Sequence, residues 1–285
     1  MYLTDKEDAL AADMIAKGWH LAGGITPSPD RFHVMGERSS GTNYAQWALE
    51  RTTQLRDVDY HWLTAKPVSS RLSKLPGIAF KQPSIGRYGW KHGVPSFPAI
   101  GRRDLIVVLF RDVFEWLVSM YAKPWHINDE MLSLNFSDFI RAPWDARVDR
   151  PTRYFDLPNV DDWNSLPLRL DRHPITGRCY VNILEMRSVK TQAYLGLEHL
   201  GGNVAFVRHE RFVADTQTCL DEMSSHYSFD LSGQTAETTE RLGSEWKNDS
   251  KSRYEEAKSA IESEKDYILS ILDLHVEKRI GFDYS

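Results

Sequence analysis

The sequence predicts an α/β fold in which helices cover a central parallel sheet in a three-layer sandwich, and three observations support this. Short apolar β-type runs alternate with amphipathic segments along the chain. The most apolar run, residues 105–110, has no polar alternation, which is typical of a parallel strand buried on both faces. A glycine-containing turn follows residues 32–35 and leads into a segment without Gly or Pro, which gives the order strand, turn, helix.

Helix and turn signals predict the elements around this turn. Residues 5–17 are expected to form a short helix that ends at Gly18, and a Gly/Pro-rich approach over 23–29 precedes the strand at 32–35. After the turn we expect a helix over 42–56. Its apolar residues are Ala45, Ala48, Leu49 and Leu55.

The second half of the chain continues the alternation. Arg111 and Asp112 follow the strand at 105–110, and residues 204–207 predict a further strand. A helix after Asp112 is expected to bury the apolar set Phe114, Leu117, Val118 and Tyr121, which has i, i+3, i+4, i+7 spacing. A long polar helix is expected over roughly 250–277. Its predicted buried stripe is Tyr254, Ala257, Ile261, Ile268, Ile271 and Leu272.

Residues 124–178 interrupt this alternation. The segment is rich in Pro, Trp, Asp and Arg and shows no sustained period. A long irregular stretch within a compact domain is usually a functional lid or a disordered insertion, and the aromatic residues favour a lid. We therefore expect one domain over residues 1–285, with 124–178 as an irregular insertion or lid.

Composition and charge exclude several classes of protein. The 285 residues are 41% hydrophobic and 26% charged, which is ordinary for a globular protein, and the net charge of −5 argues against a general nucleic-acid binder. Cys179 and Cys219 form no CxxC motif and the histidines lack metal-binding spacing, so no disulfide framework or metal site is predicted. Without a signal-like N-terminus or an apolar run of ~20 residues, we expect a cytoplasmic protein with no membrane anchor.

The most informative motif is the octapeptide Gly36–Asn43, Gly-Glu-Arg-Ser-Ser-Gly-Thr-Asn. It has the G-x-x-x-x-G frame of a phosphate-binding P-loop, but Thr42 and Asn43 stand where nucleotide hydrolases and kinases have Lys and a hydroxyl residue. Backbone N–H groups at a helix N-terminus still bind a phosphate. The loop lacks the groups that bind a triphosphate and its Mg²⁺, so a nucleotide with one phosphate at that end is predicted.

Two further sites belong with this loop. Arg111 stands at the carboxyl end of the predicted central strand, and Ser119 follows eight residues later on the next helix. Because ligands of open α/β sheets bind beyond the carboxyl ends of the strands, Arg111 should face the same crevice as the loop. An arginine fork with a hydroxyl suits a second, separate phosphate. The pair Lys91-His92, just upstream of the central strand, is the third site.

At these positions the chain resembles the sulfotransferases that use 3′-phosphoadenosine 5′-phosphosulfate. Residues 40–44, Ser-Gly-Thr-Asn-Tyr, are similar to the family's Ser-Gly-Thr-Thr-Trp 5′-phosphosulfate loop. Residues 111–121 are similar to its 3′-phosphate motif, with the same spacing of Arg and Ser. Residues 91–95, Lys-His-Gly-Val-Pro, resemble the Lys-Thr-His-Leu-Pro segment that carries the family's catalytic base, and residues 207–210 resemble its late Tyr-Glu motif.

The resemblance implies a metal-independent sulfuryl transfer to a hydroxyl. His92 would take the proton from the acceptor hydroxyl as it attacks sulfur in line, and Arg38, Lys91 or both would stabilise the developing charge. Amides of the loop would hold the 5′-phosphate, and Arg111 with Ser119 would hold the 3′-phosphate. The implied donor-binding residues are Arg38, Ser39, Ser40, Gly41, Thr42, Asn43, Arg111 and Ser119.

Two departures from the family pattern leave assignments open. The family often has Lys or Arg directly before Ser-Gly-Thr, but here that residue is Ser39 and the cation, Arg38, stands one position earlier. Lys91 and His92 are contiguous, whereas the family has Thr between them, so either residue is a candidate for the base.

The acceptor is expected to be a carbohydrate or a polar small molecule, because Trp125, Trp144 and Trp163 in the lid segment can stack on sugar faces. Two other functions stay open. Residues 105–112 also look like a Walker B strand that ends in an acid, which would indicate a P-loop kinase acting on a small molecule. The displaced cation at Arg38 is also compatible with a non-catalytic P-loop-like protein that binds a nucleotide or a glycan.

Overall fold

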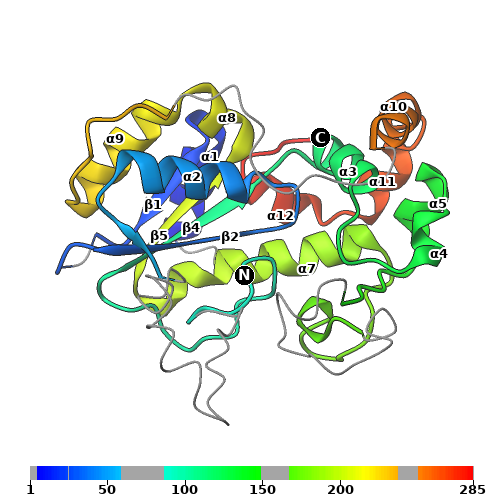
Figure 1. Ribbon diagram of the computed structural model, residues 1–285, viewed down its shortest axis with the longest axis horizontal. Coiled ribbons are helices and arrows are strands. Elements are labelled where there is room, and N and C mark those ends of the chain that lie inside the picture. The colour runs from blue at the N-terminus through cyan, green and yellow to red at the C-terminus, as the bar shows by residue number, and fades with distance from the viewer. Residues whose placement is uncertain (1–4, 25, 59–86, 149–166, 237–249, 285) are drawn as a thin grey trace, which may run out of the picture.

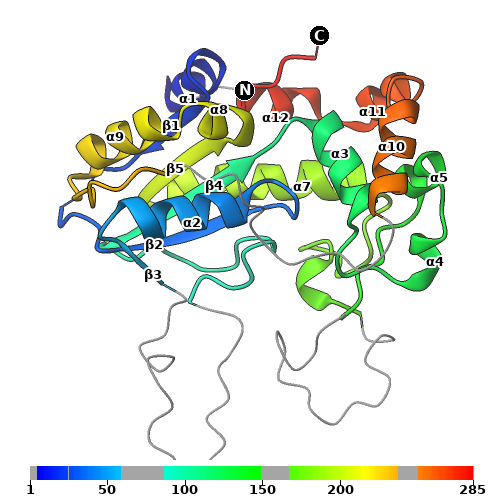
Figure 2. The ribbon, with the colours of Figure 1, turned by 45° about the horizontal axis from the view of Figure 1, so that its top comes forward.

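The computed structural model describes residues 5–24, 26–58, 87–148, 167–236 and 250–284, which form an α/β structure around a five-stranded sheet. The strand order is β1 (Trp19–Ala22), β5 (Asn203–Arg208), β4 (Asp104–Phe110), β2 (Arg31–Gly36) and β3 (Arg56–Asp57) (Figure 1; β3 is labelled in Figure 2). β1 runs antiparallel to β5, and the other neighbouring pairs are parallel. The prediction of a central parallel sheet flanked by helices is confirmed, except that β1 pairs with β5 in the antiparallel direction.

The register of the three parallel strands brings the predicted sites together. β4 is the central strand, and all seven of its residues are buried. Gly36 at the end of β2 pairs with Leu109 of β4, and Phe110 of β4 pairs with Arg208 at the end of β5. The carboxyl ends of β2, β4 and β5 therefore lie at one edge of the sheet, where ligands of open α/β sheets bind.

Helices cover both faces of the sheet. Alternate residues of β4 point to opposite sides, so Leu105, Val107 and Leu109 join one core and Ile106, Val108 and Phe110 join the other. The first core includes residues of α2 (Thr42–Thr52), α8 (His209–Ala214) and α9 (Thr216–Tyr227). The second includes residues of α1 (Asp5–Ala16), α7 (Ile183–Leu195), η5 (Gly196–Leu200) and α12 (Leu274–Arg279).

A third group of helices packs beside the sheet, as Figure 2 shows. It comprises α3 (Val113–Ala122), α4 (Asp129–Leu132), α5 (Phe136–Arg141), α10 (Ser250–Ala260) and α11 (Lys265–Ile271). Its core contains the fully buried Trp116 and Trp144. Because α3 starts directly after β4, this group adjoins the edge where the strands end.

The expectation that 124–178 is irregular is wrong for part of the segment. Its described residues form α4, α5 and the short 3₁₀ turn η4 (Arg169–Asp171). The two helices form because an asparagine caps each of them: Asn128 accepts from the Met131 amide and Asn135 from the Asp138 amide. Residues 149–166, with Trp163, lie outside the described residues.

The prediction of one long helix over 250–277 is also wrong, because three shorter helices occupy this region. The last break occurs at Asp273, whose carboxylate accepts from the amides of His275 and Val276 and so starts α12 as an N-cap. Ile271, predicted to be buried, is 41% exposed at this break. The strand β1 and the helix α7 were not predicted. In the described parts of the chain, no helix combines the length and the apolar character needed to cross a membrane.

A buried ion pair fastens α7 to α12. Arg187 donates from Nε to Glu277 Oε1 at 2.6 Å and from Nη2 to Glu277 Oε2 at 2.8 Å, and both side chains are almost fully buried. Removing one partner of such a pair leaves an uncompensated buried charge, which is far more destabilising than losing an exposed pair. The neighbouring pair of Lys278 with Asp283 is exposed, and its N–O distance is 3.0 Å.

We therefore expect Glu277→Gln to lower the free energy of unfolding by about 3 kcal/mol. Lys278→Gln on the same helix should change it by less than about 1 kcal/mol. Urea unfolding of both variants measures the difference. Equal effects of the two substitutions would show that the buried pair contributes no more than a surface pair.

Candidate functional site

The loop between β2 and α2 is a tight turn that leaves the start of α2 uncapped. The Ser40 hydroxyl and amide both bond to the Glu37 carbonyl, at 2.6 and 3.2 Å, and Ser40 is 1% exposed. Ser39 has a left-handed backbone with φ of 63°. Helix α2 begins after Gly41 with no side-chain cap. Its first-turn amides, including those of Thr42 and Asn43, are therefore available to an anion.

Gly41 is required by both its conformation and its surroundings. Its φ is 90°, which glycine adopts at little cost. A side chain at this position would overlap the ring of His209, which follows β5. Burial, with a contribution from Arg111, lowers the pKa of His209 to about 4, so this ring is neutral near pH 7. The close approach of Gly41 to a neutral ring fixes the loop against the end of β5.

Arg111 connects the loop to helix α3. Its Nη1 donates to the Ser39 carbonyl at 2.9 Å and to the Ser119 hydroxyl at 2.9 Å. Its own carbonyl accepts from Arg187 Nη2 at 2.7 Å, which fixes the backbone at the end of β4. The predicted pair of Arg111 and Ser119 is thus in direct contact and lies against the loop, as its position at the strand end indicated.

Lys91 and His92 lie against the entrance of the loop. The Gly36 amide donates to the Lys91 carbonyl at 3.0 Å, and His92 Nδ1 is 2.7 Å from the Gly36 carbonyl. A carbonyl oxygen only accepts, so the hydrogen of the neutral ring is on Nδ1 and the lone pair on Nε2. Burial and the charge of Lys91 lower the pKa of His92 well below its usual value, so the ring is neutral near pH 7. His92 Nε2 is therefore able to accept a proton.

The ammonium group of Lys91 lies at the start of α2. Its Nζ donates to the Asn43 side-chain oxygen at 2.8 Å. The loop has Thr42 where a P-loop usually has its lysine. Lys91, from a different segment, places a positive charge beside the same first turn of the helix. Arg38 and Lys91 were the two cations predicted to stabilise a transferred group, and Lys91 is the one that lies beside the first turn of α2.

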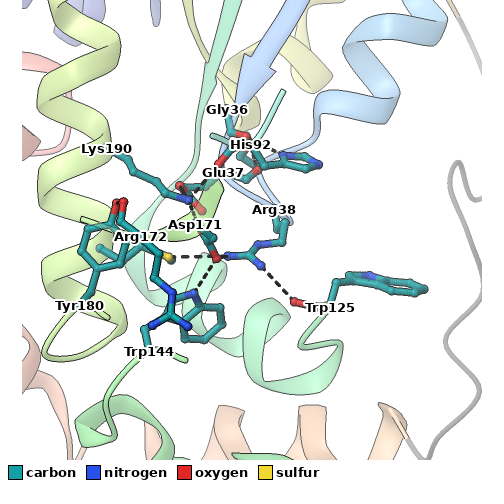
Figure 3. A network of polar contacts seen from close by, with 12 residues as sticks. Gly36, Glu37, Arg38, His92, Trp125, Trp144, Asp171, Arg172, Tyr180 and Lys190 are labelled. Atoms are coloured by element: carbon teal, nitrogen blue, oxygen red, sulfur yellow. Dashed lines mark hydrogen bonds and ion pairs between the residues drawn. The ribbon is translucent and has the colours of Figure 1, made fainter. Parts of the chain in front are cut away.

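Arg38 points away from solvent, toward Asp171 and the Trp125 carbonyl (Figure 3). It is 2% exposed, and its Nη2 donates to Asp171 Oδ2 at 2.5 Å while Nη1 donates to the Trp125 carbonyl at 3.1 Å. The ring centroids of Trp90 and Trp144 lie 5.5 and 5.0 Å from the guanidinium carbon. This geometry does not support the expected direct contact of Arg38 with a donor, because its charge is already paired and buried.

Lys190 of α7 lies behind the same loop and is fully buried. Its Nζ contacts Asp171, lies 2.9 Å from Glu37 Oε1 and donates to the His92 carbonyl at 2.9 Å. Burial raises the pKa of Glu37, against the opposing effect of Lys190 and Arg38. Burial alone would also raise the pKa of Asp171, but Arg38 and Lys190 outweigh it and lower that pKa.

Sequence reasoning did not identify Asp171, Lys190 or His209 as members of the site. Asp171 and Lys190 come from elements that were not predicted, η4 and α7. The cap of α7 was a usable signal, since Asn182 accepts from the amides of Leu184 and Glu185.

Trp125 and Trp144, which were predicted to stack on an acceptor, differ in how deeply they are buried. Trp144 is fully buried and donates to Asp171, so it is part of the interior rather than an acceptor surface. Trp125 is half-buried. Among the residues that the structure describes, no group of three or more His, Cys, Asp or Glu side chains is arranged to hold a metal ion.

The chain was compared with known proteins by sequence and by structure. No protein-family model, no curated protein and no solved structure matches it.

The two constraints on Gly41 predict a strong effect of Gly41→Ala. Gly177 is a matched control, because its φ of 68° is also left-handed but nothing lies within 4 Å of an added side chain. Gly177→Ala should cost about 1 kcal/mol of unfolding free energy, from backbone strain alone. Gly41→Ala should cost about 3 kcal/mol, because overlap with His209 adds to that strain. Thermal unfolding of both variants tests this, and similar losses would contradict the predicted overlap.

Proposed function

We propose that this protein is a sulfotransferase that moves a sulfuryl group from 3′-phosphoadenosine 5′-phosphosulfate to a hydroxyl of a carbohydrate or polar small molecule. The observation that carries the proposal is the position of Arg111, whose guanidinium group joins the Ser39 carbonyl of the loop to Ser119. The loop that leads into α2, where one phosphate would bind, therefore adjoins the Arg111–Ser119 pair, where a second phosphate would bind. A donor with two separate phosphates requires two such neighbouring sites.

The loop would act as a P-loop-like cradle for the 5′-phosphate. The uncapped amides of Thr42 and Asn43 would bind its oxygens, and Lys91 would add the positive charge that Arg38, buried against Asp171, does not provide there. Arg111 and Ser119 would bind the 3′-phosphate. Ser40 would shape the loop rather than contact the donor, because its hydroxyl bonds to the Glu37 carbonyl.

In the proposed reaction, His92 is the base. The acceptor oxygen attacks sulfur and forms a new S–O bond, while the S–O bond to the 5′-phosphate breaks and its electron pair leaves with the phosphate oxygen. His92 Nε2 takes the proton of the acceptor hydroxyl, since Nδ1 is engaged with the Gly36 carbonyl. Lys91 stabilises the negative charge on the departing phosphate. The resulting assignment is His92 as base and Lys91 as electrostatic catalyst.

The geometry of Asp112 does not favour the alternative of a P-loop kinase. A Walker B acid must present its carboxylate to a metal ion. Here Asp112 Oδ1 accepts from the amides of Phe114 and Glu115 as the N-cap of α3, and Oδ2 accepts from the Tyr284 hydroxyl at 2.9 Å. Both oxygens are therefore already engaged in holding helix α3 and the C-terminal residues together.

Binding of 3′,5′-adenosine bisphosphate tests the donor site. Without magnesium, it should raise the melting temperature of the protein, whereas Mg-ATP should have a smaller effect. Arg111→Ala should weaken bisphosphate binding by about tenfold to a hundredfold, measured by calorimetry. Arg102→Ala, at an exposed residue two positions before β4, is the control and should bind normally. Stabilisation by Mg-ATP alone would favour the kinase.

Catalysis is tested with labelled donor and a panel of hydroxylated acceptors. His92→Ala should lower kcat about a hundredfold and leave bisphosphate affinity nearly unchanged. Because burial lowers the pKa of His92, kcat of the wild-type protein should stay constant as pH falls through 6.5 and decrease only in more acidic solution. Bisphosphate binding with no transfer to any acceptor would instead indicate a non-catalytic binding protein.

A further inference from the structure

Four charged side chains form a buried cluster behind the loop, composed of Glu37, Arg38, Asp171 and Lys190 (Figure 3). Each is at most 5% exposed. They come from three separate parts of the chain, namely the loop, the turn η4 and the helix α7. None of them is needed to explain how the loop amides or Arg111 would bind an anion.

Asp171 is the centre of this cluster. Its carboxylate accepts from Arg38 Nη2 at 2.5 Å, from Trp144 Nε1 at 2.8 Å and from Lys190 Nζ. Three donors occupy most of the accepting capacity of a carboxylate. Two of these donors are cations, so Asp171 remains ionised although it is fully buried.

Each cation that Asp171 binds also holds part of the candidate site. Arg38 belongs to the loop and donates to the Trp125 carbonyl at 3.1 Å, in the segment that follows α3. Lys190 donates to the carbonyl of His92 at 2.9 Å. Through two side chains, one carboxylate is therefore connected both to the donor loop and to the backbone of the proposed base.

Stability alone does not explain this arrangement. A buried ion pair is often no more stabilising than well-packed apolar residues of the same volume, because the charges lose their hydration. Unlike apolar packing, charge-assisted hydrogen bonds are directional, so they also define the geometry of the groups that they join. A misplacement of about 1 Å in an active site lowers a rate on the order of a hundredfold.

We propose that Asp171 is a positioning residue that fixes the donor loop and His92 relative to each other, through Arg38 and Lys190. The inference rests on the proposed sulfuryl transfer for its catalytic consequence. Its structural part, that the loop is ordered from η4, does not depend on that function. The turn η4 thereby determines the geometry of the donor loop.

The test uses Asp171→Asn, which keeps the shape of the side chain and removes its charge. We expect kcat to fall about a hundredfold. Amide hydrogen exchange should become faster in residues 36–43 and 90–93, with the central strand β4 still protected. Asp129→Asn, an exposed acid-to-amide change on α4, is the matched control and should alter neither measurement.

A second variant separates position from charge balance. Asp171→Asn combined with Lys190→Met removes one anion and one cation. The melting temperature of this double variant should therefore be higher than that of Asp171→Asn alone. Its kcat should stay low, and amide exchange in the loop should stay fast. Recovery of kcat together with stability would overturn the inference, because charge neutrality would then suffice. Wild-type exchange and kcat in a folded Asp171→Asn protein would also overturn it.

The hydrogen-exchange measurement keeps this inference distinct from the proposed function. If the wild-type protein binds no bisphosphate and transfers no sulfate, the proposed function fails. Exchange in residues 36–43 then still decides whether Asp171 orders the loop. If Asp171→Asn does not fold, the charge-balanced double variant gives the same comparison.

Discussion

The contact between Arg38 and Asp171 is the interaction on which the geometry of the candidate site depends. A guanidinium group that is 2% exposed remains charged, so it requires an anionic partner in the interior. Asp171 is that partner, and Trp90 and Trp144 lie beside the guanidinium group. This requirement decides which side of the loop faces inward. In the first turn of α2, Thr42 is also buried and Asn43 is exposed.

The inward direction of Arg38 changes how the loop acquires positive charge. A cation neutralised by a buried carboxylate contributes little field at the surface of the loop. Lys91 and Arg111, which contact Asn43 and Ser39 respectively, are the cations that flank the loop. They arrive from the segment before β4 and from its end. Neighbouring segments thus supply the positive charge beside the loop, because the loop's own cation, Arg38, is buried against Asp171.

Features that depend on local sequence were predictable, and features that depend on packing were not. The strand at 105–110 and its neighbours at 32–35 and 204–207 follow from apolar runs, and the contact of Arg111 with Ser119 follows from their spacing on one strand–helix unit. The direction of Arg38 depends on Asp171, which is distant in sequence and belongs to a turn without periodicity. The prediction of one helix over 250–277 failed because apolar spacing does not register a competing N-cap such as Asp273.

The pairing of residues 91–92 with Gly36 makes the proposed base part of the loop. The Gly36 amide donates to Lys91 and its carbonyl accepts from His92, so one residue fixes both the position and the tautomer of the imidazole. A side chain at residue 36 would overlap the Leu109 carbonyl and the Ser40 hydroxyl, because β2 and the returning loop approach closely there. The first glycine of the motif is therefore needed for more than the turn. It allows the loop, the central strand and His92 to contact one another around residue 36. Lys190 also donates to the His92 carbonyl and so fixes the backbone of the same histidine.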